Sequence, residues 1–390
     1  MPAQSSKIIS DTYCNEAWRN VHFDDSGWLA PCCTFREHRP KNINSVSEYW
    51  DSDWLADARQ KMLNGERVAG CQNCYAKEGR GERSQRMAKN KQHGYITTPK
   101  LKSMEISFGN ICNKNCNICR PTRSSMIAKD YQKLEKTDPD FKFAMGMRQR
   151  EVNATKRYVS RLPDYKQSLE SVNHIQLDGG EPFYTRQCTE LLEYMIENKM
   201  FDRSISAVTN GSVNDEQVAM LKQFQHVFFG LSIDGIEDMY HVTRSPHDWN
   251  WWIEHHNRII EAGFARKYNS VIHCLNIHQL PEQLEYFTSH RDGSDHPCFD
   301  FTALVSHDHL LPDVVPINIL EDTIERLQQR EHLCENNAEL DNLRNCVIHL
   351  EWYTKNRKEI HQVNFKRMVD VFGPAKKIDY QKHLPWKIQT

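Results

Sequence analysis

Three cysteines lie within eight residues of the chain, at Cys112, Cys116 and Cys119, separated by gaps of three and then two residues. Thiolates are soft ligands that favour zinc, copper(I) or iron–sulfur clusters. A structural zinc site closes its shell with four protein ligands, and this loop supplies only three. Three thiolates can instead hold three corners of a cubane cluster. The fourth iron would then be open for a substrate or cofactor.

The elements that would position this loop alternate in type after residue 100. Six β-rich runs alternate with helical patterns, which predicts an α/β fold with a parallel sheet. The predicted strands are Lys102–Phe108, Val172–Leu177, Ser204–Val208, Val227–Ile233, Ser270–Asn276 and Phe299–Val305. The predicted helices are Cys188–Glu197, Asp215–Phe224, Trp251–Ala262 and Pro281–His290. In a parallel barrel the carboxyl ends of the strands meet at one face, so we expect the polar residues there to converge.

The cysteine spacing after the first strand resembles the signature of the radical S-adenosylmethionine (SAM) superfamily. Leu177–Pro182, which closes the second strand with Asp-Gly-Gly-Glu, is similar to the Gly-Gly-Glu motif of that family. Thr209–Gly211 and Ser232–Gly235 end the third and fourth strands and look like elements that position the ribose and carboxylate of SAM. The resemblance covers about residues 100–310. It implies a TIM-like partial (β/α)6 radical SAM barrel.

The resemblance also implies a cofactor and a reaction. Cys112, Cys116 and Cys119 would hold a [4Fe-4S] cluster whose open iron binds SAM. One electron, from a donor such as flavodoxin or ferredoxin, would cleave SAM to a 5′-deoxyadenosyl radical that abstracts hydrogen from the substrate. The residues implied to contact SAM are Gly179, Gly180, Glu181, Thr209, Asn210, Ser232, Asp234, Arg244, Asn276 and Ile118.

Four of these residues have individual expectations. Glu181 would receive the ammonium group of SAM. Arg244 and Asn276 could contact ribose or carboxylate, and Arg244 could equally be a surface residue. Ile118 stands where family members usually place an aromatic residue against adenine, so apolar contact is kept and stacking is lost.

Residues 1–95 are predicted to form a small α+β module that precedes the barrel. Trp18–Phe23 and Trp28–Cys32 flank a turn and predict a hairpin, and Val46–Leu63 predicts a helix. The module's cysteines resemble those of a twitch domain, a shortened relative of the SPASM domain, although such modules usually follow the barrel. The best matches are Cys14, Cys32, Cys71 and Cys74, with Cys33 as the spare thiol.

The implied occupant of this second set is an auxiliary [4Fe-4S] cluster. Four thiolates would leave no open iron, so the cluster would transfer electrons or tune the site. A four-cysteine zinc ribbon is the alternative.

The remaining chain divides into predicted segments around the barrel, which spans residues 96–310. Residues from about 130 to 170 are too long for an ordinary connection and predict a helical insertion. Residues 311–390 predict a C-terminal helical cap of three helices.

Four residues are weaker candidates for a direct part in the chemistry. Cys274 could donate a hydrogen atom near the radical, although a buried cysteine is more often a core residue. His307, Asp308 and His309 follow the sixth strand and could contact substrate or move protons. Trp251, Trp252 and Trp352 are predicted to be packing residues.

Composition limits the partners and the compartment. Lys and Arg number 50 against 52 Asp and Glu, so no net charge favours nucleic acid or a membrane surface. The polar start and the lack of a long apolar run predict a cytosolic protein, and clustered cysteines there indicate metal ligation over disulfides.

Three functions fit the sequence. The first is modification of a peptide or protein, because the Ser-Ile-Asp-Gly element and the cysteine module resemble those of enzymes that mature ribosomal peptides. The second is oxidation or rearrangement of a sugar-like or other small molecule. The third is a non-enzymatic iron–sulfur or zinc scaffold that binds SAM.

Overall fold

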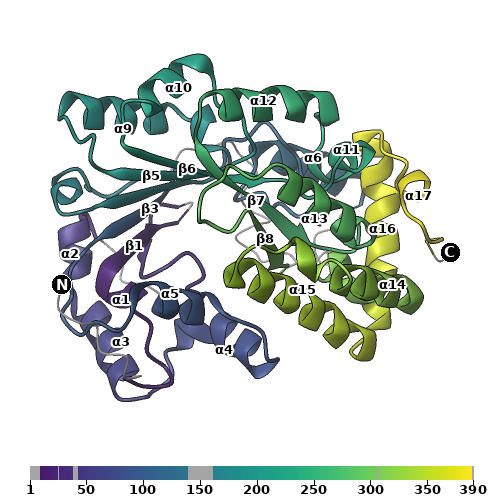
Figure 1. The fold of residues 1–390 in the computed structure, drawn as a ribbon, viewed down its shortest axis with the longest axis horizontal. Helices are drawn as coiled ribbons and strands as arrows, with labels where there is room; N and C mark the ends of the chain where they lie inside the picture. The colour runs from purple at the N-terminus through teal and green to yellow at the C-terminus, as the bar shows by residue number, and fades with distance from the viewer. Residues whose placement is uncertain (1–8, 25, 38–42, 139–160, 305–306, 389–390) are drawn as a thin grey trace.

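One eight-stranded sheet organises the computed structural model, which describes residues 9–24, 26–37, 43–138, 161–304 and 307–388. The spatial order is β2-β1-β3-β4-β5-β6-β7-β8 (Figure 1). The strands are β1 (Asn20–Phe23), β2 (Leu29–Ala30), β3 (Ser103–Ser107), β4 (His174–Asp178), β5 (Ser204–Thr209), β6 (His226–Ser232), β7 (Ala265–Ile272) and β8 (Phe299–Ala303). Every neighbouring pair from β1 to β8 is parallel, and only β2 runs antiparallel. The predicted fold class, α/β with a largely parallel sheet and a helical C-terminal region, is confirmed.

Helices lie before, between and after the strands. The N-terminal helices are α1 (Glu16–Arg19), α2 (Val46–Trp50), α3 (Asp53–Leu63), α4 (Gln72–Gly79) and α5 (Gln85–His93). The helices between strands are α6 (Ser125–Thr137), α9 (Arg186–Glu197), α10 (Asp215–Leu221), α11 (Asp238–Arg244), α12 (Trp249–Glu261) and α13 (Leu280–Ser289). The C-terminal helices are α14 (Ile317–Gln328), α15 (Asn337–Lys355), α16 (Glu359–Lys376) and α17 (Tyr380–His383).

Three predictions about the elements differ from the observed ones. The C-terminal region, predicted as three helices, holds four α-helices within the described residues. The single helix predicted over Val46–Leu63 is two helices, because the Ser52 hydroxyl accepts a hydrogen bond from the Leu55 amide and begins α3 anew. The strand predicted over Ser270–Asn276 is wrong in its bounds: β7 begins at Ala265 and ends at Ile272. Most of the predicted insertion, residues 139–160, lies outside the described residues.

The two faces of the sheet differ in polarity. One row in register is apolar and buried: Phe23, Ile106, Leu177, Ala207 and Phe229. Helices α9, α10 and α12 lie along one face of the sheet (Figure 1), and Leu191, Leu192 and Met195 of α9 join the same core. The adjacent row faces the opposite way and is polar: His22, Glu105, Gln176 and Ser206. The inner face of this open barrel is therefore hydrophilic.

The N-terminal segment extends the barrel sheet. Strand β1 pairs in parallel with β3, and Val21 and Phe23 share its apolar face. The N-terminal segment also contacts the C-terminal helices. In the loop between α4 and α5, the Arg83 amide donates to Asn345 Oδ1 of α15 at 2.8 Å. The assignment of residues 1–95 to a separate domain stays a prediction. None of the helices within the described residues combines the length and hydrophobicity needed to cross a bilayer.

Candidate functional site

The cysteine loop connects β3 to α6 and is closed at its base. The Ser125 amide donates to the Asn110 carbonyl at 2.6 Å, and the Asn110 side-chain amide donates to the Pro121 carbonyl at 2.9 Å. Cys116 is buried, while Cys112 and Cys119 are partly exposed. All three thiols therefore belong to one compact loop at the carboxyl end of the first barrel strand.

The Gly-Gly-Glu segment holds this loop through the backbone amides of Gly180 and Glu181. The Gly180 amide donates to the Gly109 carbonyl at 2.8 Å, and the Glu181 amide donates to the Ile111 carbonyl at 2.7 Å. A Cβ added at Gly180 would collide with the Ile111 carbonyl, and Gly179 has a φ of +135°. The cysteine loop is what comes close to the paired glycines, and their contact with SAM stays a prediction.

The carboxylate of Glu181 joins the second and third strand ends. It accepts hydrogen bonds from the Thr209 hydroxyl at 2.6 Å and from the Asn210 amide at 2.7 Å. Burial raises the pKa of Glu181 to about 7, although these hydrogen bonds favour the ionised form. The expectation that Glu181 receives the ammonium group of SAM stays a prediction.

Asn210 also connects the third strand end to the cysteine loop. Its side-chain amide donates to Asn113 Oδ1 at 2.8 Å and lies 3.9 Å from the Cys112 sulfur. Asn113 in turn donates to the Ser212 hydroxyl at 2.9 Å. The Gly-Gly-Glu element and the Thr-Asn-Gly element therefore both contact the cysteine loop, and the three lie together.

Asp234 and Arg244 form a buried ion pair near the same loop. Their charged atoms are 2.9 Å apart, and Asp234 also accepts a hydrogen bond from the Val271 amide at 2.9 Å. Arg244 is close enough to Cys116 and Cys119 for their charges to interact. Arg244 is buried, so the alternative that it is a surface residue is wrong. Ser232, the other residue predicted from this element, ends β6 and is partly exposed.

Asn276 and Cys274 lie beyond the strand on which they were predicted. Asn276 closes a turn after β7, where it accepts from the His273 amide and donates to the Val271 carbonyl, both at 2.9 Å. Because the strand ends at Ile272, the inference that these two residues share a strand face is wrong. Ile118 is partly buried against the hydrophobic core.

Sequence reasoning missed Lys114, which lies between Cys112 and Cys116. The residue is only 1% exposed, and its ammonium has no hydrogen-bond partner within the described residues. The ammonium lies 3.6 Å from the ring centroid of Trp251, which was predicted to be a packing residue. Burial lowers the pKa of Lys114 to about 7. One indication of this buried lysine was present in the sequence, namely its position between two cysteines of the motif.

A [4Fe-4S] cluster fits the residues of this loop. The donor set is three thiols, and burial together with the neighbouring cysteines raises the pKa of Cys112 well above its usual range. The Lys114 amide points at the Cys112 sulfur, 3.4 Å away, and the Lys114 ammonium supplies buried positive charge beside the thiols. Bound iron holds cysteines as thiolates, so an anionic cluster would compensate that buried charge.

The N-terminal cysteines also gather in space. Burial is the main cause of a raised pKa at Cys14, Cys32 and Cys71, and Cys14 and Cys71 each raise that of Cys32. Cys74 contributes to the raised pKa of both Cys14 and Cys71. No group of three or more His, Cys, Asp or Glu side chains in the described ranges is arranged to bind a metal ion. In a [4Fe-4S] cluster each cysteine binds a different iron, so its thiolates do not share one ion.

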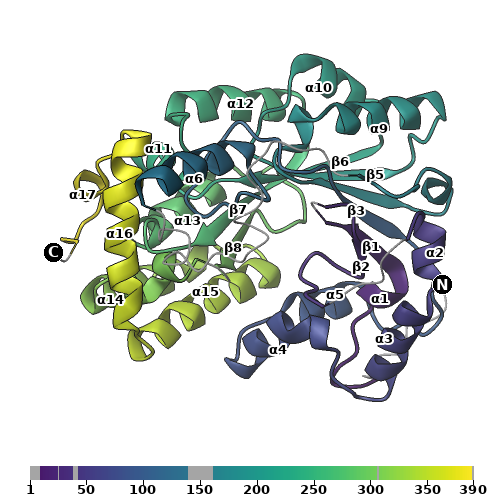
Figure 2. The same cartoon turned by 180° about the vertical axis from the view of Figure 1, so that it is seen from behind.

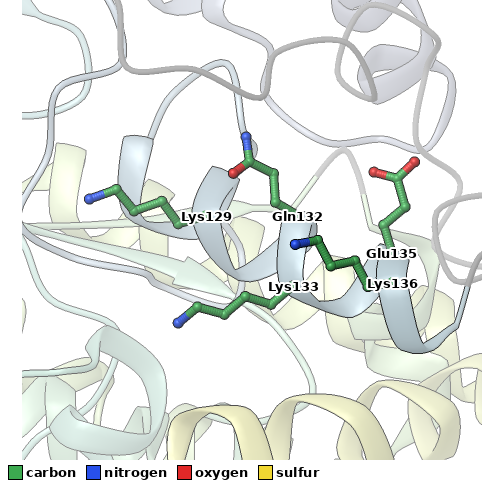
Figure 3. Close-up of a pocket in the computed structure, with 5 residues that line it drawn as sticks. All are labelled: Lys129, Gln132, Lys133, Glu135 and Lys136. Carbon is green, nitrogen blue, oxygen red and sulfur yellow. The ribbon is translucent and has the colours of Figure 1, made fainter.

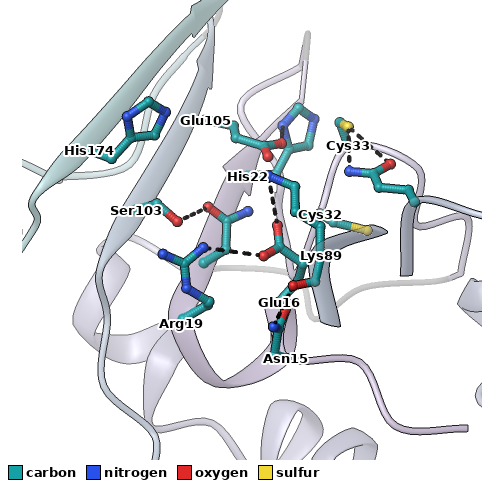
Figure 4. A network of polar contacts seen from close by, with 12 residues as sticks. Asn15, Glu16, Arg19, His22, Cys32, Cys33, Lys89, Ser103, Glu105 and His174 are labelled. Atoms are coloured by element: carbon teal, nitrogen blue, oxygen red, sulfur yellow. Dashed lines mark hydrogen bonds and ion pairs between the residues drawn. The ribbon is translucent and has the colours of Figure 1, made fainter. Parts of the chain in front are cut away.

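A polar network lies between these cysteines and the barrel sheet (Figure 4). The His22 ring of β1 and the Glu105 carboxylate of β3 lie 3.2 Å apart, and both side chains are buried. Cys33 points toward this network and accepts a hydrogen bond from Gln85 at 3.5 Å. Cys33 thus faces the inner side of the barrel.

The histidine candidates lie where α16 packs on the segment after β8. His309 is buried, and burial lowers its pKa well below the usual range. Asp308 is exposed and lies 3.9 Å from His361 of α16, which the sequence did not single out. His361 also pairs with the buried Asp313 at 2.8 Å. His307 adopts a left-handed backbone with φ of 67°.

A pocket of about 530 Å³ lies along α6, the helix that follows the cysteine loop (Figure 3). Its lining residues are Lys129, Gln132, Lys133, Glu135 and Lys136. The three lysines are exposed and recur at helical spacing, so this side of α6 is positively charged.

One family model matches the central part of the chain. Residues 106–287 match the model described as the Radical SAM superfamily. The match includes the three-cysteine loop and the Gly-Gly-Glu, Thr-Asn-Gly and Ser-Ile-Asp-Gly elements. No curated protein matches the chain.

Solved structures resemble the chain at low similarity. Native anSMEcpe with bound AdoMet is 17% identical with a TM-score of 0.37, over 58% of this chain and 60% of that one. SuiB of Streptococcus suis bound to S-adenosylmethionine is 15% identical with a TM-score of 0.37, over 68% of this chain and 51% of that one. TYW1 with a lysine-pyruvate adduct is 14% identical with a TM-score of 0.33, over 71% of this chain and 82% of that one. The chain thus spans about three fifths of the anSMEcpe chain and about half of the SuiB chain.

Proposed function

We propose that the protein is a radical SAM enzyme that abstracts hydrogen from a peptide or protein substrate. The observation that carries the proposal is the backbone clamp on the cysteine loop: Gly180 and Glu181 bind Gly109 and Ile111, and the same Glu181 binds Thr209 and Asn210. Three strand ends are thereby fixed against one loop of three thiols. A [4Fe-4S] cluster with SAM, when bound, supplies a 5′-deoxyadenosyl radical after one-electron reduction.

The residues of the chain have distinct parts in this proposal. Cys112, Cys116 and Cys119 would hold the cluster, and Lys114 would offset its negative charge. Asn210 and Ser232 would orient SAM, while the Asp234–Arg244 pair brings a guanidinium near the loop. Ile118 would give adenine an apolar surface. The inner face of the sheet would receive the substrate, because Gln176 and Ser206 are partly exposed there and offer donors and acceptors.

Anaerobic reconstitution tests this function. The protein should form 5′-deoxyadenosine when given SAM and dithionite, and the Cys112→Ala/Cys116→Ala/Cys119→Ala variant should form none. Cys188→Ala, a buried thiol of α9, is the matched control and should retain activity. Cleavage that persists in the triple variant would rule out the assignment. Binding of SAM without cleavage in the wild type would favour the scaffold function instead.

We further propose that Cys14, Cys32, Cys71 and Cys74 hold an auxiliary [4Fe-4S] cluster. Their mutual effect on pKa supports one shared site, and Cys33 stays the spare thiol of the prediction. A cluster with four cysteine ligands could accept an electron when a substrate radical is oxidised. We also propose a cytosolic location, where all thirteen cysteines, which are free in the structure, stay reduced.

Iron analysis separates the auxiliary cluster from a zinc ribbon. The wild type should bind about eight irons per chain, and Cys71→Ala/Cys74→Ala about four, while Cys33→Ala keeps the full content. The Cys71→Ala/Cys74→Ala variant should still cleave SAM and should lose substrate turnover. About four irons with bound zinc in the wild type would contradict the proposal.

The substrate class is tested by its effect on SAM cleavage. A short peptide encoded beside the gene should raise the rate of 5′-deoxyadenosine formation and change in mass on incubation. A response only to sugar-like compounds would favour the small-molecule alternative, which the polar inner face of the sheet also accommodates.

A further inference from the structure

The C-terminal end of α16 reaches the cysteine loop. Lys376, the last residue of that helix, is 9% exposed. Its ammonium donates to the Asn115 carbonyl and to Asn117 Oδ1, both at 2.5 Å. These two asparagines stand on either side of Cys116, so one buried ammonium binds both neighbours of the middle cysteine.

Helix α16 ends in a C-cap directly after Lys376. Lys377 has a left-handed backbone with φ of 59°, and the Ile378 amide returns to the Gly373 carbonyl at 2.9 Å. A Cβ at Gly373 would lie 3.1 Å from the Ile378 carbonyl oxygen, so the two segments pack closely there. The reversal places Tyr380 beside Lys376, and the Tyr380 hydroxyl donates to Asn117 Oδ1 at 3.0 Å.

Helix α16 is fixed in this position by α6. Figure 2 shows the two helices near one another, and the rings of Tyr131 and Phe372 meet with centroids 5.5 Å apart. The Lys376 ammonium lies 4.8 Å from the same Phe372 ring. The C-terminal segment thus packs on the helix that follows the cysteine loop as well as on the loop itself.

Other elements complete the hold on the two asparagines. The Asn115 amide donates to the Ser245 carbonyl at 2.9 Å, and its side chain donates to Asp130 of α6 at 2.6 Å. The Asn117 side chain donates to the Val242 carbonyl of α11 at 2.9 Å. Each asparagine is therefore bound from several elements, and Lys376 is the only group that binds both among the described hydrogen bonds.

The charge of Lys376 matters as well as its hydrogen bonds. Burial lowers its pKa to about 8, while Asp130, Cys116 and Cys119 favour the charged form. In a buried setting a nearby cation stabilises the more negative, reduced state of an iron–sulfur cluster. Asp130 of α6, which accepts the hydrogen bond from Asn115, compensates the cation partly.

We propose that Lys376 is a positioning residue of the SAM-binding site, which fixes the backbone around Cys116 and raises the reduction potential of the cluster held there. The inference rests on the proposed function and extends it to the C-terminal segment, outside the residues that match the superfamily. Tyr380 supports the same contact through Asn117.

Redox titration of the reconstituted full-length enzyme tests the charge. The SAM-binding cluster is recognised by an electron paramagnetic resonance signal that changes when SAM is added. Its reduction potential should become more negative in Lys376→Met. SAM cleavage at a fixed reductant concentration should fall by about tenfold or more. Lys376→Arg should keep a potential near that of the wild type. Lys366→Met, an exposed lysine of the same helix paired with Asp370, is the control and should change neither quantity.

Hydrogen exchange of the iron-free protein tests the positioning without a cluster. Tyr380→Phe removes one hydroxyl and should speed exchange of the amides around Asn117, whereas Lys366→Met should not. Unchanged exchange in Tyr380→Phe, or an unchanged potential in Lys376→Met with full iron content, would overturn the inference. A wild type that lacks a SAM-responsive cluster would instead refute the proposed function, and the exchange experiment would still report on the loop.

Discussion

Asp234 and Arg244 bind each other in the interior of the barrel, with 2.9 Å between a carboxylate oxygen and a guanidinium nitrogen. Asp234 is 0% exposed, and Arg244 is buried too. The sequence suggested that both residues contact SAM. The geometry gives each of them a structural partner first, because a buried charge is costly unless it is paired.

Asp234→Asn should therefore destabilise the iron-free protein. The substitution leaves the Arg244 guanidinium buried without its counter-charge, which costs about 3–5 kcal/mol of unfolding free energy. Anaerobic urea denaturation measures the loss. Glu237→Gln, an exposed position three residues away, should change the stability by less than about 0.5 kcal/mol. Equal stability of the two variants would mean that the pair contributes nothing.

Glu181 should make stability depend on pH. Burial raises its pKa from 4.5 to about 7, so the folded state binds this proton more tightly than the unfolded state does. The resulting stabilisation is fully present below about pH 4.5 and is lost as the pH rises through about 7. Between pH 5 and 8 the iron-free wild type should lose roughly 2–3 kcal/mol relative to Glu181→Gln. Glu193→Gln, at an exposed position of α9, should follow the wild type. Parallel pH profiles for wild type and Glu181→Gln would contradict the prediction.

Lys114→Met should have opposite effects on the iron-free and iron-loaded protein. The buried ammonium has no hydrogen-bond partner among the described residues, so removing its charge should raise the unfolding free energy of the iron-free protein by about 1–2 kcal/mol. The same change should reduce iron incorporation, because the positive charge beside the thiols is gone. Denaturation and iron analysis measure the two effects. Lys133→Met on the exposed side of α6 should alter neither, and a destabilised iron-free Lys114→Met would contradict the argument.

Local sequence predicted the barrel strands and the motifs at their ends. Strands β3, β4, β5, β6 and β8 begin and end within two residues of the prediction. Buried residues alternate with more exposed ones along β4, β5 and β8. The bounds of β7 were wrong, since its start at Ala265 follows the short turn after α12 and its end depends on the Asn276 turn. The cysteine loop and its glycines were found because their chemistry depends on spacing along the chain.

The contacts missed by the sequence are long-range. Lys376 and Asn117 are separated by 259 residues, and a lysine near the end of a helix normally indicates a solvated charge. Strand β1 joins the sheet through pairing with β3, which no local pattern in residues 1–95 reveals. Lys114 has the residue type of a surface position, and only the packing of α12 shows that it is buried.

His349→Ala should weaken the contact between the N-terminal segment and the C-terminal helices. Glu82 is buried between His349 at 3.4 Å and Arg80 at 2.5 Å. Burial alone would raise the pKa of Glu82, but its hydrogen bonds with these two partners outweigh that effect and lower the pKa to about 2. Its stabilisation is thus present above about pH 4.5 and is lost as the pH falls toward 2.

Removing His349 should cost roughly 2–3 kcal/mol near pH 7, measured by denaturation, and should speed hydrogen exchange in α4 and α15 together. Arg344→Ala breaks an ion pair of 2.9 Å with Glu331 on the exposed side of α15 and should change the stability far less, because solvent screens a surface pair. If the two variants lose the same stability, the buried contact is no stronger than a surface pair. The segment that carries Cys71 and Cys74 would then be held chiefly by the β1–β3 pairing, by core packing and by the contacts of Arg83 and Lys91 with α15.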